Sequence, residues 1–268
     1  MKQKVRHISV ESSAFTLVEV LVVISVITLL MSIILPITRR ARMAAYLVIC
    51  QSQLRQWGVV FEGYSFANDG FYPHIDGLDR ADGKADNFGW VDMLPPLMRE
   101  KRWRDYPIWH KPTKGIYQCP MAKPGSGYSY NPLRNGYFSY AMNSCLELDG
   151  SCWEPLNCPG GNNMPSFLNT TLIKAPSRVI LLFDQLLDPH KGYDGNQTYG
   201  DAGKYCGSYP KSFSARHFRK KDKLGGSILY CDYHVEWVES VWNKNWPEEM
   251  KEEDAQAPPR NDLNWYPY

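Results

Sequence analysis

The sequence predicts an α+β protein in which one long N-terminal helix packs on a head built from a loop-rich antiparallel β-sheet. Two observations predict this fold. An almost unbroken apolar run over residues 15–37 passes directly into an amphipathic helical pattern that ends near residue 66. The rest of the chain is rich in Tyr, Trp, Gly and Pro and holds a few short runs of β-forming residues. Of the 268 residues, about 200 remain for the head, which is the size of one ordinary domain.

The apolar run is long enough to cross a membrane. At ~1.5 Å per residue, a helix over residues 15–37 measures about 34 Å, against a hydrocarbon core of roughly 30 Å. Residues 1–14 are basic, as the start of an export signal is, but no small-x-small cleavage site follows the run. We therefore expect residues 15–37 to be retained as a transmembrane segment. Glu19 needs a reason to lie there, because an ionised carboxylate in lipid is costly unless it is paired.

The helix is expected to continue over residues 38–66. Pro36 should kink it or loosen one turn, since proline lacks an N–H and crowds the preceding carbonyl. Turn signals from Asn68 onward place the end of the helix between Gly63 and Asn68. Apolar and small residues recur at intervals of three and four, which is typical of a half-buried helix. These residues are Ala41, Ala44, Ala45, Val48, Leu54, Trp57, Val60 and Phe61.

The exported head is expected to occupy residues 67–246. Its clearest strand candidates are residues 177–183, 227–231 and 235–241, and the last two should form a hairpin. The stretch 143–209 is predicted to be mostly loop. Residues 247–268 are acidic and then proline-rich, which predicts an extended or disordered tail.

The start of the chain resembles the type IV prepilin signature. The resemblance rests on a basic leader, the string Ala-Phe-Thr-Leu-Val-Glu at residues 14–19, and Pro36 near the end of the span. In that family a dedicated peptidase cuts before the Phe, and the new N-terminus is methylated. The resemblance implies a leader of residues 1–14 and cleavage between Ala14 and Phe15. It also implies that Glu19 and Pro36 act in assembly. The family strongly favours Gly where Ala14 stands.

The resemblance also implies an orientation, which charge alone does not give. Three basic residues precede the span and three follow it, so the positive-inside count is tied. By resemblance, the leader lies in the cytoplasm and the chain passes once through the inner membrane. The head then lies in the periplasm or at the cell surface. The implied partners are the inner membrane, prepilin peptidase and other pilin-like subunits. The alternative is an ordinary signal anchor whose Glu19 lies near the headgroups.

A second resemblance covers the head. It is carried by residues 50–58, 69–73, 118–120, 139–143 and 216–235. These segments are similar to the large pseudopilin-like families abundant in Planctomycetes and Lentisphaerae, which carry a C-terminal His-x(9)-Asp-Gly-His-Val element. Here fourteen residues separate His217 from Asp232, and Tyr233 replaces the Gly. The resemblance implies that the hairpin is kept, with a strained or altered turn at Tyr233, because Gly tolerates positive φ and Tyr does not.

The chain has seven cysteines, and an exported head favours disulfides. The resemblance points first to Cys50 with Cys119, since both stand in the similar segments and a bridge would join the long helix to the head. The competing interpretation is a zinc site. It is disfavoured because no C-x(2)-C pair is present and export favours oxidation. Its ligands would be Cys145, Cys152, Cys158 and Cys206.

One polar cluster is a candidate for metal-hydrolase chemistry. His217, Asp232 and His234, together with Asp184 after the first strand, are competent ligands. We favour the plainer interpretation, in which Asp232 caps the hairpin turn and the histidines bond nearby backbone. No nucleophile-elbow, Walker, Rossmann or H-E-x-x-H pattern occurs in the sequence. The sequence therefore predicts no enzyme, no cofactor and no resident metal.

Charge and aromatic content bear on the partners. The net charge is +2 and the basic residues are dispersed apart from residues 216–221, which excludes a nucleic-acid footprint. Exposed aromatic rings can stack on sugars, although aromatics used as core filler are the favoured interpretation. The residues concerned are Trp90, Trp103, Tyr106, Trp109, Trp153, Trp242, Trp246 and Trp265.

Two functions are therefore carried forward. By resemblance, the chain is a structural subunit of a type II secretion or type IV pilus-like filament, inserted and assembled through its N-terminal helix. The alternative is a membrane-anchored extracytoplasmic protein that binds polysaccharide and does not polymerise. Glu19 separates the two, since a mere anchor should tolerate its replacement by Val.

Overall fold

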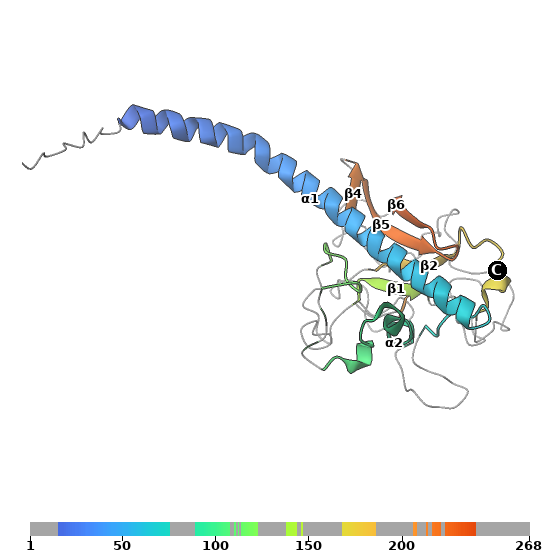
Figure 1. The fold of residues 1–268 in the computed structure, drawn as a ribbon. Helices are drawn as coiled ribbons and strands as arrows, with labels where there is room; N and C mark the ends of the chain where they lie inside the picture. The colour runs from blue at the N-terminus through green and yellow to red at the C-terminus, as the bar shows by residue number, and fades with distance from the viewer. Residues whose placement is uncertain are drawn as a thin grey trace, which may run out of the picture. The chain divides into compact units, whose positions relative to one another are not determined.

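The computed structural model is α+β, as predicted. It describes residues 16–75, 89–107, 110, 112, 114–122, 138–143, 146, 168–185, 206–207, 213, 216–220 and 223–239. One long helix, α1 (Leu17–Ala67), continues through Pro36 without interruption and ends where the turn signals predict (Figure 1). The chain divides into two compact units, residues 1–42 and 43–268. The first contains the apolar part of α1, and the second contains the rest of α1 and the head.

In the first unit, α1 is long and apolar enough to cross a membrane. No side chain from Thr16 to Arg42 is buried within the protein. The hydroxyl groups within this stretch are satisfied locally, since Ser25, Thr28 and Ser32 each donate a hydrogen bond to the backbone carbonyl three residues earlier, at 2.6–2.9 Å. Pairing the hydroxyl groups with the helix's own carbonyls in this way lowers the cost of placing them in lipid.

In the second unit, α1 buries one stripe. Leu54, Trp57 and Phe61 are fully buried, as the sequence predicted. The predicted face is wrong at its beginning, because Ala44, Ala45 and Val48 are exposed and burial starts at Cys50. Their helical spacing gave an amphipathic pattern, but spacing does not tell where the head begins to cover the helix. The full set of buried helix residues is Cys50, Leu54, Trp57, Gly58, Phe61 and Ser65.

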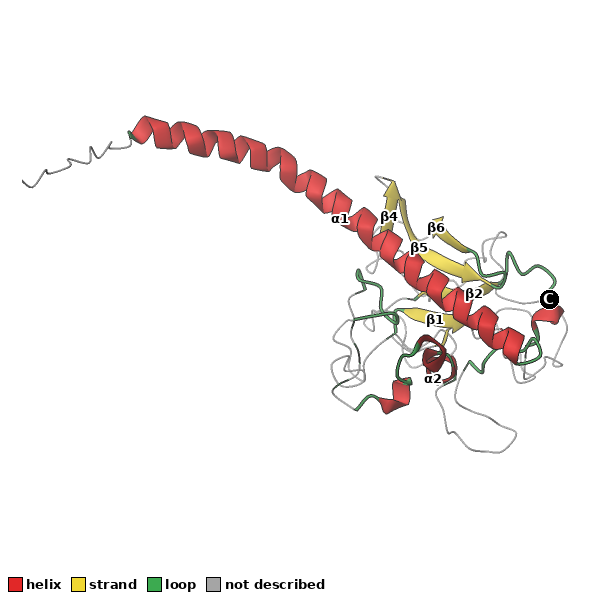
Figure 2. Ribbon diagram, viewed as in Figure 1, coloured by secondary structure: helices red, strands yellow, loops and turns green. Residues whose placement is uncertain are grey.

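The head contains a six-stranded sheet, drawn in yellow in Figure 2. Its strands are β1 (Tyr140–Asn143), β2 (Ile180–Asp184), β3 (Cys206–Gly207), β4 (His217–Lys220), β5 (Lys223–Tyr230) and β6 (Val235–Glu239). The order is β3-β1-β2-β5-β4, and β6 also pairs with β5. All pairs are antiparallel except β1 with β3. The predicted strand and hairpin therefore form β2, β5 and β6, while β1, β3 and β4 are too short to be found from periodicity.

The core is formed by α1, the sheet and short helical turns. Those turns are α2 (Trp90–Met93), η1 (Pro95–Met98) and η2 (Trp103–Asp105), whereas a further turn, η4 (Thr170–Leu172), contributes no buried residue. The Trp57 ring meets the Trp90 ring edge-on, with centroids 4.9 Å apart. The Trp57 indole N–H donates to the Ile116 carbonyl at 3.0 Å, so this large buried side chain also has its polar atom satisfied.

Of the strained and altered turns that the replacement of Gly by Tyr233 predicted, the β5–β6 turn is the strained one. Tyr233 has φ 68°, a left-handed conformation that is costly for a residue with a side chain. Its side chain is half-buried against the core, and its hydroxyl lies 3.1 Å from Ser65 Oγ near the end of α1. Packing and this hydrogen bond therefore offset the cost of the backbone conformation.

Two glycines of α1 give a matched test of how closely the helix packs on this hairpin. A Cβ at Gly58 would lie 3.0 Å from Leu229 Cδ1 and 3.4 Å from the Tyr233 carbonyl oxygen, whereas a Cβ at Gly63 would meet nothing within 4 Å. Replacing an exposed helical Gly by Ala stabilises by about 1 kcal/mol. We therefore expect Gly63→Ala to raise the free energy of unfolding by about that amount.

The free energy of unfolding of Gly58→Ala should be lower than that of Gly63→Ala by at least about 1 kcal/mol, because overpacking a filled core costs 1–3 kcal/mol. Denaturant titration of the detergent-solubilised chain measures both variants. Equal stabilisation by the two substitutions would show that α1 does not sit this close to the hairpin.

Candidate functional site

The first candidate site is the N-terminus of α1. The Thr16 backbone N–H and hydroxyl both donate to Glu19 Oε2, at 2.8 and 2.7 Å. In return, the Glu19 backbone N–H donates to the Thr16 hydroxyl at 3.2 Å. This is a capping box, which satisfies N–H groups that the first turn of a helix leaves without partners. Ala14 and Phe15, the predicted processing residues, lie outside the described residues.

The capping box gives Glu19 a role within its own chain. Its carboxylate is hydrogen-bonded by Thr16 and lies in the first turn of α1, where the helix dipole favours a negative charge. The sequence signal for this role is Thr-x-x-Glu at residues 16–19, and it was missed. An experiment on Glu19 therefore has to separate its charge from its capping.

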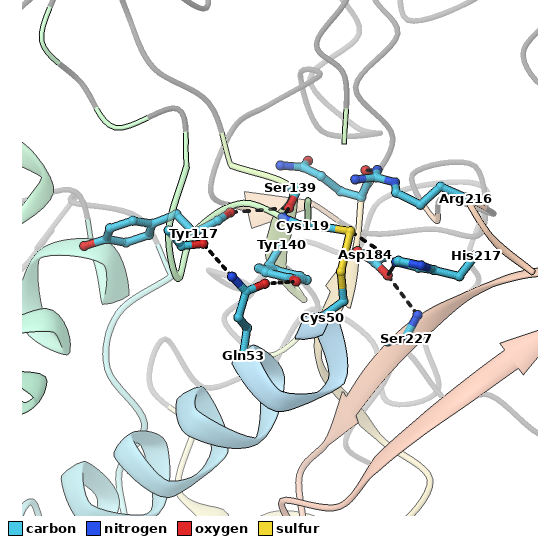
Figure 3. Close-up of a disulfide and its surroundings, with 12 residues drawn as sticks. Cys50, Gln53, Tyr117, Cys119, Ser139, Tyr140, Asp184, Arg216, His217 and Ser227 are labelled. Atoms are coloured by element: carbon cyan, nitrogen blue, oxygen red, sulfur yellow. Dashed lines mark hydrogen bonds and ion pairs between the residues drawn. A yellow bond between two sulfur atoms is a disulfide. The ribbon is translucent and has the colours of Figure 1, made fainter. Parts of the chain in front are cut away.

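The second candidate site is a buried cluster around a disulfide (Figure 3). Cys50 of α1 is bonded to Cys119, their Cα atoms are 5.3 Å apart, and both side chains are buried. This agrees with the pair that the second resemblance implied. The bridge joins residues 69 positions apart and ties the helix to the segment 114–122.

One helical turn further on, Gln53 reinforces the attachment of α1. Its amide donates to the Gly115 carbonyl at 2.7 Å, and its carbonyl accepts from the Tyr140 hydroxyl of β1 at 2.7 Å. Burial raises the pKa of Tyr140 well above its usual value, so the phenol stays protonated as a donor. The disulfide and Gln53 together hold α1 to the head segment and to the sheet.

His217 joins the disulfide rather than the hairpin histidine. Its side chain is fully buried, and its Nε2 atom lies 3.1 Å from Cys119 Sγ and 3.4 Å from Asp184 Oδ2. Asp184, at the end of β2, also accepts the Ser227 backbone N–H at 3.0 Å. Strand pairing brings His217 and Asp184 together. Because β2 and β4 both pair along β5, the end of one strand comes beside the beginning of the other.

The predicted set of His217, Asp184, Asp232 and His234 is brought together only in part, at His217 and Asp184. His217 pairs with Gly225 of β5, and the strand runs about 17 Å from there to Tyr230, before the turn that contains Asp232 and His234 begins. Asp232 instead caps the hairpin turn, accepting the His234 backbone N–H at 3.2 Å and contacting its ring Nδ1 at 2.5 Å. This is the capping that the plainer interpretation expected for Asp232.

The buried cluster does not have the geometry of a Cys-His-Asp triad. In a triad the imidazole uses one nitrogen for the nucleophile and the other for the carboxylate. Here both contacts fall on Nε2, and His217 Nδ1 has no hydrogen-bond partner among the described residues. The sulfur is also held in a disulfide. The arrangement therefore gives no support to nucleophilic catalysis.

The aromatic residues predicted for a sugar-binding face and the cysteines of the zinc alternative are described only in part. Trp90 and Trp103 are buried, so they are core residues and not part of a sugar-binding face, whereas Tyr106 is half-buried. The remaining aromatic candidates Trp109, Trp153, Trp242, Trp246 and Trp265 lie outside the described residues. So do Cys145, Cys152 and Cys158 of the zinc alternative, and Cys206 is described only as part of the short strand β3.

Comparison of the chain with protein-family models, curated proteins and solved structures found no match. The long apolar helix followed by a mainly antiparallel sheet is compatible with a pilin-like architecture.

The disulfide is testable in protein purified from the cell envelope. We expect non-reducing peptide mapping to find the peptides of Cys50 and Cys119 linked. Replacing both by Ala should lower the free energy of unfolding by roughly 2–4 kcal/mol, because the open chain gains conformational freedom when unfolded. Cys231→Ala is the control for losing a buried sulfur, since Cys231 is a buried free thiol. Recovery of Cys50 and Cys119 as free thiols would refute the prediction.

Proposed function

We propose that the chain is a structural subunit, pilin-like or pseudopilin-like, of a type II secretion or type IV pilus-like filament. The observation that carries the proposal is α1 itself. One uninterrupted helix has an unburied apolar part with Glu19 in its first turn and, in the second unit, a part packed into the head. An anchor needs only the apolar part. A filament subunit needs a stiff helix that continues from its membrane segment into its head.

The proposal assigns α1 two successive roles. The apolar part holds the subunit in the inner membrane after prepilin peptidase removes the leader. The same surface then packs against neighbouring subunits in a filament, with the heads outside the cytoplasm. Glu19 pairs with the N-terminal amine of a neighbour, so that both charges are tolerated only in the correct register.

The alternative of an anchored polysaccharide binder is weaker. Its strongest residues were aromatic side chains, and the two tryptophans among them that the structure describes, Trp90 and Trp103, are buried in the core. The exposed aromatic side chains among the described residues, Phe66 and Phe71, are not among those that the alternative named. The alternative keeps only Tyr106 and aromatic residues outside the described part of the chain.

Processing is the first test. Mass spectrometry of the protein from native membranes should find a chain that begins at Phe15 and carries one added methyl group on its amine. The leader signature motivates this result. An intact N-terminus at Met1 would contradict it and would favour the simple anchor.

Assembly is the second test. Glu19→Val should insert into the membrane at least as well as the wild type, because the span becomes more apolar. It should not enter filaments, because the neighbour's amine loses its counter-charge. Envelope fractionation measures insertion, and crosslinking between neighbouring heads measures assembly.

Two further variants separate charge from capping. Glu19→Gln keeps the capping-box pattern and removes the charge, whereas Thr16→Ala removes the cap and keeps the charge. We expect Glu19→Gln to fail in crosslinking and Thr16→Ala to crosslink. The reverse result would show that Glu19 acts only on its own helix, and wild-type crosslinking by Glu19→Val would favour the anchored binder.

A further inference from the structure

Three buried side chains from distant parts of the chain point their donor atoms at one another. Cys50 Sγ, Cys119 Sγ and His217 Nε2 all lie within 4.8 Å of each other. They come from α1, from the segment 114–122 and from β4. Figure 3 shows the imidazole facing the two sulfurs with the Asp184 carboxylate beside it. A disulfide requires only the two cysteines, so the imidazole and carboxylate need a separate explanation.

The two bonded sulfurs lie nearer to each other, and Cys119 Sγ lies nearer to the imidazole nitrogen, than the edges of a zinc tetrahedron. Bond lengths of about 2.3 Å to sulfur and 2.0–2.1 Å to nitrogen give edges of about 3.6 Å for S···N and 3.8 Å for S···S. His217 Nε2 is 3.1 Å from Cys119 Sγ, so that sulfur has to move outward by about 0.5 Å. Once reduced, the two sulfurs move apart toward van der Waals separation, which is close to the S···S edge.

Asp184 adds an independent argument. Its carboxylate is fully buried, and Oδ1 has no hydrogen-bond partner among the described residues. The 3.4 Å separation from His217 is also long for a charge-assisted hydrogen bond, which is typically about 2.7–2.9 Å. A buried carboxylate with an unpartnered oxygen and a loose partner needs further compensation, which a nearby cation supplies.

We propose that, in the dithiol form of the protein, Cys50, Cys119 and His217 bind one zinc-class divalent metal ion, with the Asp184 carboxylate beside His217 as a nearby negative charge and not as a ligand. Each thiol gives up its proton when its sulfur binds, so one metal ion enters and two protons leave. The imidazole binds in its neutral form through Nε2. Two thiolates and one imidazole suit zinc or cobalt better than calcium or magnesium.

The site is structural and not catalytic, because Cys50, Cys119 and His217 are all buried away from any substrate. The metal and the disulfide exclude each other, since a disulfide offers no thiolate. The same residues therefore join α1 to the head by metal in the dithiol form and by a covalent bond in the oxidised form. The proposal concerns the head alone and does not depend on filament assembly.

The test uses the full chain in detergent, reduced under anaerobic conditions by a phosphine, which leaves no competing thiol. Cobalt(II) is the spectroscopic probe, and zinc then displaces it. We expect each reduced chain to bind one cobalt ion tightly. Its spectrum should show thiolate-to-cobalt charge transfer and the visible bands of tetrahedral cobalt. The air-oxidised protein should not show this spectrum.

The variants locate the ligands. His217→Gln and the double variant Cys50→Ser with Cys119→Ser should each lose the tightly bound cobalt ion. Cys231→Ser is the matched control, because Cys231 is a buried cysteine outside the cluster, and it should retain the cobalt ion. Wild-type spectra and stoichiometry in the first two variants would place the metal on other cysteines and overturn the proposal. The proposal would also be overturned if the reduced wild type bound no cobalt ion tightly through thiolates.

Two controls exclude misfolding as the explanation. Cys50 and Cys119 are far apart in sequence, so disulfide formation by oxidised His217→Gln reports a folded head. Zinc-edge X-ray absorption of the wild type gives the ligand set without any variant. Two sulfur and two nitrogen or oxygen ligands support the proposal, and three or four sulfurs contradict it. If His217→Gln does not form the disulfide, the absorption measurement decides alone.

Discussion

One helix has to satisfy two environments, and the rest of the structure depends on how α1 divides its side chains between them. Up to Arg42 no side chain is buried within the protein, and the hydroxyls are bonded to the helix's own carbonyls. From Cys50 onward a stripe of large side chains enters the core of the head. Every backbone hydrogen bond inside the helix is local, so both environments can be met without interrupting α1.

The head is built around that buried stripe. Trp57 is the largest side chain of the stripe and is fully buried, Gly58 leaves room for the β5–β6 turn, and Ser65 lies within hydrogen-bond distance of Tyr233. The left-handed Tyr233 is tolerated because its side chain reaches the helix. A Gly there would adopt the turn more easily but would lose this contact. The hairpin and the helix therefore stabilise each other, and the covalent link at Cys50 adds to the same attachment.

Polar groups are used sparingly, and each has a defined position. Glu19 is bonded by Thr16 in the first turn of α1, so its carboxylate is satisfied locally before any neighbour is considered. His217 and Asp184 are buried beside the disulfide, where β2 and β4 meet along β5. The first group belongs to the proposed assembly function and the second to the stability of the head. A buried or membrane-embedded polar group is costly where it lacks such partners, as Asp184 Oδ1 does among the described residues.

The sequence by itself determined the elements whose signals are local. The apolar run, the buried positions Leu54, Trp57 and Phe61, the helix end and the β5–β6 hairpin all follow from periodicity and turn residues. The capping box at Thr16 was also readable from the sequence. Resemblance supplied the pairing of Cys50 with Cys119, which local patterns do not contain.

Only the tertiary structure decided which distant residues meet. It separated His217 from Asp232 and His234 and placed it with Cys119 and Asp184, because strand order along β5 is not encoded in any one segment. It also showed that Trp90 and Trp103 fill the core, since composition gives the number of aromatic side chains but not the surface against which they pack. Contacts between residues about 100 positions apart depend on the whole fold, and local sequence patterns do not reach that far.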